Sequence, residues 1–96
     1  MAVAIEMRFT GATLAQYDEV MKLMELHDGR PAPEGALFHW VAATDDGIMV
    51  VDVWETMEQF DRFARENIMP NAQKAGISAP PDVTTHAVHN HLPPSG

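Results

Sequence analysis

The sequence predicts an α+β fold in which a four-stranded antiparallel sheet carries two helices on one face. Four segments show strand patterning and two show helical patterning, in the order β-α-β-β-α-β. An Asp-Gly turn joins the second and third strands as a hairpin, and right-handed crossovers place the remaining strands. This order predicts the ferredoxin-like arrangement, with the strands ordered 4-1-3-2 across the sheet.

The first strand and the first helix are expected within residues 2–27. Apolar residues alternate with polar or small ones over 2–10, which is typical of a strand with one buried face. Thr13 and Gln16 have the spacing of a capping box, and apolar residues follow at helical intervals. We therefore expect a helix from about 14 to His27, where the helix dipole favours a cation. A loop rich in Pro and Gly follows over 28–35.

The second half of the chain repeats this plan. Strands are expected over 36–43 and 48–55, joined at Asp46-Gly47 by a turn that needs positive φ angles. A second capping box at Thr56 opens a helix that Pro70 is expected to end or kink, with a short turn over 71–75. The last strand is expected over 82–91. The chain is interpreted as one domain, 1–92, with a disordered tail, 93–96.

Composition excludes several classes of function. The formal net charge is −8 and only six residues are Lys or Arg, so neither a nucleic acid nor an anionic membrane is an expected partner. Cysteine is absent, which excludes disulfides and thiol nucleophiles. The N-terminal residues lack the pattern of a signal peptide, and no apolar run reaches the ~20 residues of a membrane helix. We expect a cytoplasmic protein.

The two faces of the sheet are assigned from the rule that helices cover apolar residues. The helix side is predicted to hold Val3, Ile5, Met7, Phe9, Phe38, Trp40, Ala42, Met49, Val51 and Val53. The open side is then predicted to hold Glu6, Arg8, Leu37, His39, Val41, Ile48, Val50, Asp52, Trp54 and His86. Apolar surface of this extent marks an association site in a soluble protein. We therefore expect a homodimer that pairs through the open face and encloses a cavity.

One segment resembles a known family. The strand Val50–Glu55, which ends in Trp-Glu, leads through a short cap into a helix with aromatic residues, Phe60 and Phe63. This resembles the dimeric α/β-barrel superfamily, in its antibiotic-biosynthesis monooxygenase-like branch. The resemblance implies a ferredoxin-like protomer, a homodimer and a cavity. It also implies chemistry on a small molecule without a cofactor, because its members include cofactor-free monooxygenases.

Candidate site residues follow from the predicted open face. His86 is the candidate proton carrier, Asp52 or Glu6 would orient it, and Arg8 would hold an oxyanion. Trp54 would stack on a planar substrate, and a hydrophobic ligand pocket would also be lined by His39, Val50 and Leu37. The alternative for the charged residues is a structural ion-pair cluster, with Arg8 bonded to Asp52 or Glu6.

Other chemistries are weaker hypotheses. His86, His89 and His91 suggest a metal site, but alternate residues of a strand point to opposite faces, so the three cannot converge. We expect no metal and no bound cofactor, since the sequence has no phosphate-binding loop or serine elbow. The first functional hypothesis is a cofactor-independent monooxygenase or cyclase acting on an aromatic or polyketide-like molecule. The second is a non-catalytic small-molecule carrier or stress-type barrel, which an Arg8–Asp52 pair would favour.

Overall fold

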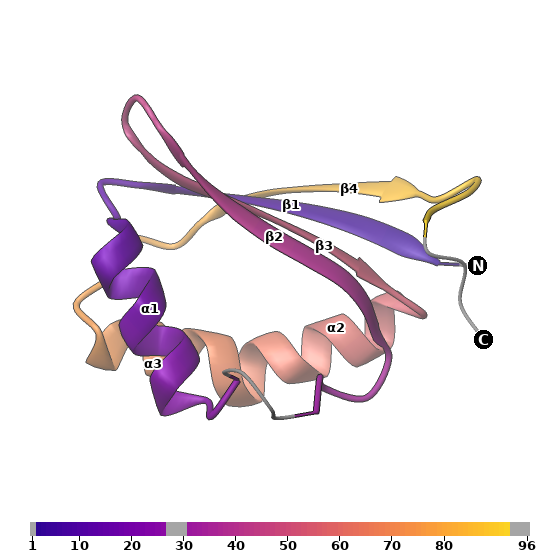
Figure 1. Cartoon of the computed structure of the whole chain (residues 1–96), viewed down its shortest axis with the longest axis horizontal. Coiled ribbons are helices and arrows are strands. Elements are labelled where there is room, and N and C mark those ends of the chain that lie inside the picture. Colours follow the sequence, from indigo (N-terminus) through magenta and orange to yellow (C-terminus); the bar gives the residue numbers. More distant parts are fainter. Residues whose placement is uncertain (1, 27–30, 93–96) are drawn as a thin grey trace.

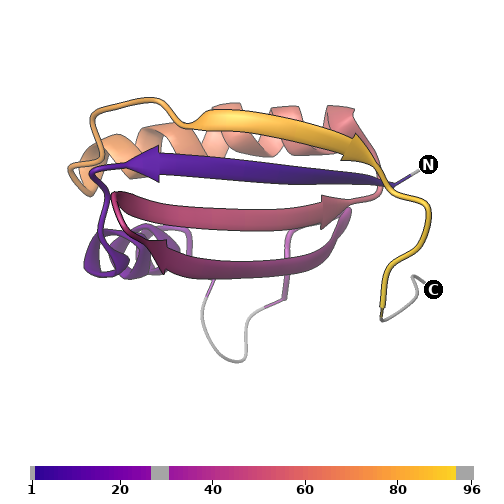
Figure 2. The same cartoon turned by 90° about the horizontal axis from the view of Figure 1, so that it is seen from above.

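A computed structural model describes residues 2–26 and 31–92 and contains one four-stranded antiparallel sheet. All its helices lie on the same face of that sheet (Figure 1). The strands are β1 (Val3–Thr10), β2 (Ala36–Thr44), β3 (Gly47–Trp54) and β4 (Asp82–Ala87). They lie side by side in the order β2-β3-β1-β4 (Figure 2). This is the predicted order counted from the other edge, so the α+β ferredoxin-like prediction is confirmed. The predicted tail, 93–96, lies outside the described residues.

Helix α1 (Leu14–Leu23) begins at the predicted capping box. The Thr13 hydroxyl accepts from the Gln16 amide at 3.1 Å, and the Gln16 side chain accepts from the Thr13 amide at 3.0 Å. The helix ends before the predicted boundary, because Glu25 adopts a left-handed φ of 58°. His27 lies outside the described residues.

The second helical segment continues past Pro70. It consists of α2 (Met57–Phe63), the π-helical turn η1 (Ala64–Ile68) and α3 (Met69–Lys74). Proline has no N–H to continue the α-helical bonding pattern, and its ring crowds the carbonyl four residues earlier. The wider turn directly before Pro70 accommodates this, so the predicted helix end is replaced by a local change in helix type.

The β2–β3 hairpin has a two-residue turn, Asp45-Asp46, with Thr44 paired to Gly47. Among the described residues positive φ angles occur at Glu25 and three other glycines, so the expected positive φ at Gly47 is wrong. Gly47 has a different role. A Cβ there would lie 2.1 Å from the carbonyl oxygen of Phe9, so only glycine lets β3 approach β1 this closely.

Strand β4 is shorter than predicted and ends at Ala87, opposite Val3. Beyond Ala87, the described backbone makes one further bond to this edge, from the Val88 amide to the Ala2 carbonyl. His89 and His91 therefore follow the strand instead of belonging to it. None of the helices in the described part of the chain is long and apolar enough to span a membrane.

The face prediction is correct for β1 and wrong for the β2–β3 hairpin. Ile5, Met7 and Phe9 are buried on the helix side, as expected. On β3 the buried residues are Ile48, Val50, Asp52, Val53 and Trp54, and all of them except Val53 share the helix side with the predicted β1 set. The aromatic residues of β2 are 42% exposed at Phe38 and 38% exposed at Trp40. The hairpin is turned over relative to the prediction because Asp52, taken for a solvent-facing residue, is buried at 6% exposure.

Candidate functional site

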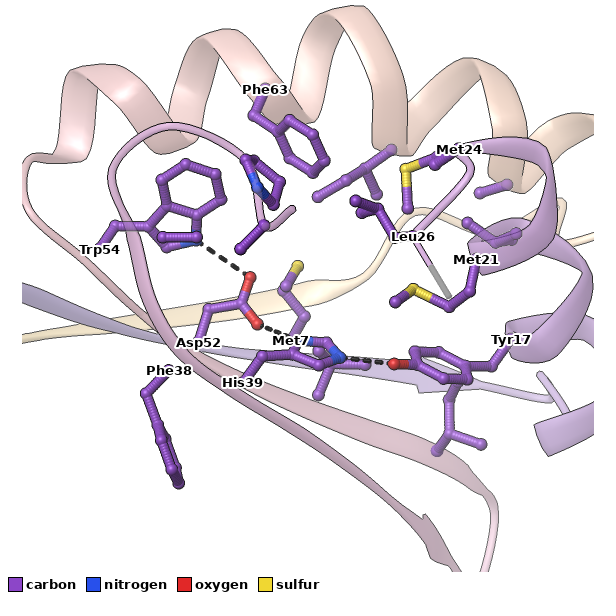
Figure 3. A pocket seen from close by; sticks show the side chains of 18 of the residues that line it. Met7, Tyr17, Met21, Met24, Leu26, Phe38, His39, Asp52, Trp54 and Phe63 are labelled. Atoms are coloured by element: carbon purple, nitrogen blue, oxygen red, sulfur yellow. Dashed lines mark hydrogen bonds and ion pairs between the residues drawn. The ribbon is translucent and has the colours of Figure 1, made fainter. Parts of the chain in front are cut away.

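A cavity of about 340 Å³ lies between the sheet and the helices (Figure 3). Its floor comes from alternate residues of β1 and β3, including Met7 and Val50, and its walls from α1 and the α2–α3 segment, including Met21 and Phe63. Methionines and other apolar side chains form most of the lining. The volume lies within the roughly 300–1,000 Å³ typical of small-molecule sites. The described chain therefore contains, by itself, an apolar cavity large enough for a small-molecule ligand.

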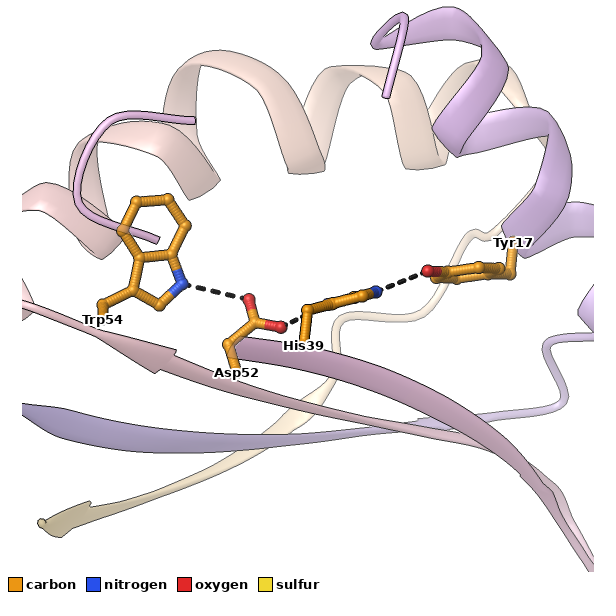
Figure 4. Close-up of polar contacts among 4 residues, drawn as sticks. All are labelled: Tyr17, His39, Asp52 and Trp54. Carbon is orange, nitrogen blue, oxygen red and sulfur yellow. Dashed lines mark hydrogen bonds and ion pairs between the residues drawn. The ribbon is translucent and has the colours of Figure 1, made fainter. Parts of the chain in front are cut away.

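Three hydrogen bonds join four side chains along the floor of this cavity (Figure 4). Asp52 Oδ1 lies 2.5 Å from His39 Nδ1, and His39 Nε2 lies 2.5 Å from Tyr17 Oη. The indole N–H of Trp54 donates to Asp52 Oδ2 at 3.1 Å. The rings of Tyr17 and His39 are nearly coplanar, 11° apart, with centroids 5.9 Å apart. We call Tyr17, His39 and Asp52, together with Trp54 as the donor to Asp52, the Asp-His-Tyr relay.

The local sequence explains how the relay is assembled. Counting back from the two-residue turn places His39 directly opposite Asp52, so both side chains point to the same face. Trp54 follows Asp52 by two residues on that face and is only 2% exposed. Its ring packs at 5.3 Å from Phe63 and 5.9 Å from Phe60, so the helix fixes the donor that holds Asp52. Tyr17 reaches the relay from the cavity side of α1.

The electrostatics of the relay favour a neutral Tyr17. Burial raises the pKa of Tyr17 from 10.0 to about 12, and the negative charges of Asp52 and Asp18 add to this shift. Tyr17 therefore keeps its proton at neutral pH. An ionised carboxylate can only accept hydrogen bonds, so Asp52 holds the proton of neutral His39 on Nδ1. The His39 Nε2 lone pair then accepts the Tyr17 O–H.

The predicted site residues divide between the two sides of the sheet. The four predicted ligand-binding residues all line the cavity, namely Leu37, His39, Val50 and Trp54. Asp52 lies with them. Their predicted place on the open face is wrong, for the reason given above for the hairpin, so the space they share lies beneath the helices. The ring of Phe38 points away from this space (Figure 3).

The other three predicted catalytic residues lie on the open face. His86 Nε2 is 2.9 Å from Glu6 Oε2, and both side chains are partly exposed. Arg8 is exposed on the same face, so the alternative pairing of Arg8 with Asp52 is wrong, because the sheet separates them. A catalytic role for His86, Glu6 or Arg8 stays a prediction.

Residues 2–26 and 31–92 contain no candidate metal centre, because no three of their His, Cys, Asp or Glu side chains lie closely enough together to hold an ion.

Tyr17 is the site residue that the sequence analysis missed. Its signal was weak: it is the single tyrosine of the chain and lies on the apolar face of an amphipathic helix. A tyrosine in such a position is interpreted as a core residue unless a polar partner beneath the helix is known.

Comparison with known proteins identifies the fold. SnoaB from Streptomyces nogalater, a cofactor-independent oxygenase, superposes with a TM-score of 0.60 at 16% identity over 96% of each chain. Rv0793 from Mycobacterium tuberculosis gives 0.67 at 16% identity, over 96% of this chain and 99% of that one. The ActVA-Orf6 monooxygenase of Streptomyces coelicolor, solved with nanaomycin D, gives 0.57 at 18% identity, over 98% and 92%. Protein-family models and curated proteins give no match to the chain. The predicted resemblance is thus confirmed at the level of structure: this chain has the fold of the antibiotic-biosynthesis monooxygenase-like proteins.

Proposed function

We propose that the protein is a cofactor-independent monooxygenase that acts on a hydrophobic aromatic molecule held in the cavity. The observation that carries the proposal is the His39–Asp52 pair, the polar centre of an otherwise apolar cavity. A histidine oriented by a carboxylate is suited to remove a proton, and an apolar surrounding strengthens its electrostatic interactions. The oxygenases that share the fold support the same class of reaction.

The proposed reaction balances without a cofactor. His39 takes a proton through Tyr17, which is bonded to its Nε2, from the enol form of a substrate written R₂CH₂, and leaves a carbanion. The carbanion reduces O₂ and binds it as a peroxide, R₂CH–OO⁻, which recovers the proton from His39. Loss of water from R₂CH–OOH gives R₂C=O, so one oxygen atom enters the substrate and the other leaves as water. Asp52 stabilises the imidazolium that forms between these steps.

Oxygen uptake with anthrone, which carries an acidic methylene between two aromatic rings, tests this function. We expect H39Q to lower the enzymatic rate about 10²- to 10⁴-fold, the usual contribution of a general base. H86Q is the matched comparison, since it changes the histidine on the other face of the sheet. Loss of activity in H86Q and not in H39Q would move the site to the open face. Tight binding of anthrone without oxygen uptake would favour the non-catalytic carrier.

The same protein is proposed to form a homodimer through the open face. Phe38 and Trp40 are large, exposed and adjacent on that face, and Met49 and Val51 extend the apolar surface. Sedimentation at micromolar concentration should give twice the 10.6 kDa chain mass. Trp40→Glu should give the monomer, because a charge opposes burial of this surface. Leu14→Ser, at an exposed apolar residue of α1, is the control and should stay dimeric.

A further inference from the structure

The hydrogen bonds of the relay converge on Asp52. Trp54 donates to Asp52 Oδ2, and His39 donates from Nδ1 to Asp52 Oδ1. With the His39 proton held on Nδ1, the unprotonated Nε2, 2.5 Å from Tyr17 Oη, can only accept, so Tyr17 is the donor. Asp52 is the acceptor at which the chain ends, and both of its oxygens are engaged. Asp52 therefore fixes the direction of the relay, because its buried carboxylate can only accept.

The cavity end of the relay can only accept a hydrogen bond. A phenol has one proton, and Tyr17 gives its proton to His39. The oxygen of Tyr17 keeps acceptor capacity and has no hydrogen left for a ligand. The cavity lining in the described chain contains no Lys or Arg, and its titratable side chains are those of Tyr17, His39 and Asp52. A polar ligand must therefore supply the hydrogen atom itself.

The geometry points to a ligand that carries an uncharged hydroxyl group, a phenol or an enol, which donates to Tyr17 Oη. This inference rests on the proposed function, because it names the substrate class of the same site. Tyr17 would then touch the substrate and pass its proton on. The ligand proton moves to Tyr17 Oη as the Tyr17 proton moves to His39 Nε2. The products of this step are a ligand oxyanion, an unchanged Tyr17 and an imidazolium held by Asp52.

Related molecules without a hydroxyl should be rejected. A methyl ether, or a ketone that cannot enolise, offers only acceptors, so its oxygen would face the Tyr17 oxygen with no hydrogen between them. A carboxylate would lose its hydration in an apolar cavity and would lie near Asp52 without a cation to balance it. The site thus distinguishes molecules of the same shape by a single hydrogen atom.

Calorimetric titration with three bicyclic molecules of similar size tests the inference: 1-naphthol, 1-methoxynaphthalene and 1-naphthoate. We expect 1-naphthol to bind at least about tenfold more tightly than either of the others, the usual worth of one hydrogen bond left unmade. Equal binding of naphthol and its ether would overturn the inference while the cavity survives as a ligand site. Absence of binding by all three molecules would overturn both the inference and the assignment of the cavity as a ligand site. Selective binding of naphthol without oxygen uptake by anthrone would leave the inference standing and the oxygenase proposal refuted.

Asp52→Asn gives a sharper version of the test, because it reverses the relay at constant volume. An amide can donate to His39 Nδ1, which moves the His39 proton to Nε2 and makes it the donor to Tyr17. The Tyr17 proton is then free to point into the cavity. We expect the preference for naphthol over its ether to fall to within about twofold, as in Tyr17→Phe. Asp61→Asn, the same substitution at an exposed position of α2, should keep the tenfold preference. A D52N variant that keeps it would contradict the inference.

Nitrogen-15 NMR of His39 checks the direction without any ligand. Neutral His39 should carry its proton on Nδ1 in the wild type and on Nε2 in D52N. A wild-type protein with the proton on Nε2 would show that the relay runs the other way and would overturn the inference.

Discussion

Removing the Asp52 carboxylate should lower the free energy of unfolding, because His39 and Trp54 both donate hydrogen bonds to it. In Asp52→Ala, the N–H groups of His39 and Trp54 lose their shared acceptor in a site where Asp52 is 6% exposed. The indole N–H of Trp54, which is 2% exposed, then stays unsatisfied at a cost of about 1–3 kcal/mol. The side chain of His39 is 37% exposed and can turn to water at a smaller cost, so we expect a total loss of about 2–3 kcal/mol. This is a large fraction of the roughly 5–15 kcal/mol that stabilises a domain.

Asp52→Asn separates the hydrogen bonds from the volume of the side chain. Its amide oxygen can accept from Trp54, and its amide N–H can donate to His39 after the change of tautomer described above. Only the charge assistance is lost, so we expect a cost of about 1 kcal/mol. Asp61→Asn, at an exposed position of α2, should stay within about 0.5 kcal/mol of the wild type.

Urea unfolding at one fixed protein concentration measures these differences. A slope of about 1–3 kcal/mol per molar urea converts the Asp52→Ala loss to a midpoint shift on the order of 1–2 M. The concentration is held fixed because association would stabilise the folded state. Equal losses in Asp52→Ala and Asp52→Asn, or a loss in Asp52→Ala no larger than in Asp61→Asn, would refute the assignment of Asp52 as the shared acceptor.

Three further predictions follow from local geometry. Ultraviolet titration of Tyr17, the single tyrosine, should show phenolate forming near pH 12, and a midpoint near 10 would contradict its partial burial beside Asp52. Since folding raises the pKa of Tyr17 above 10.0, the stability from the protonated phenol is present below pH 10 and is lost as the pH rises towards 12. Thr56→Ala should cost about 1 kcal/mol in thermal unfolding, because the Thr56 hydroxyl accepts from the Gln59 amide at 3.1 Å. Gly47→Ala should lower the free energy of unfolding by about 2 kcal/mol or more, because the new Cβ would clash with the Phe9 carbonyl oxygen. An unchanged free energy of unfolding would show that β1 and β3 can move apart without destabilising the fold.

The element order was predictable because each signal is local. The capping residues at Thr13 and Thr56 and the alternation along β1 fix where elements begin and which way they face, without knowledge of the rest of the chain. The sheet order then follows from handed crossovers. The π-helical turn before Pro70 was not predictable, since a proline in a helix admits several local solutions.

The members of the site were predicted in part, since Tyr17 was missed, and its predicted location was wrong. Alternation along each strand placed His39 and Asp52 on the same face of the sheet, and in the structure they do share a face, directly opposite each other in the hairpin. The choice of face failed because both faces of β2 and β3 are rich in apolar residues, so one polar residue decides the assignment. That residue, Asp52, is buried with partners, and the rule that charged groups face water fails where their hydrogen bonds are satisfied inside.

The π-helical turn has a consequence for the length of the chain. Phe63 and Ile68 both line the cavity although they are five residues apart, a spacing that would put them about 140° apart around an ordinary α-helix. Deleting one residue between 64 and 68 would restore α-helical spacing and keep both side chains on the cavity side. The same deletion in α3 would turn the residues that follow it by about 100°. Insertions and deletions among homologous chains are therefore expected to collect at this turn.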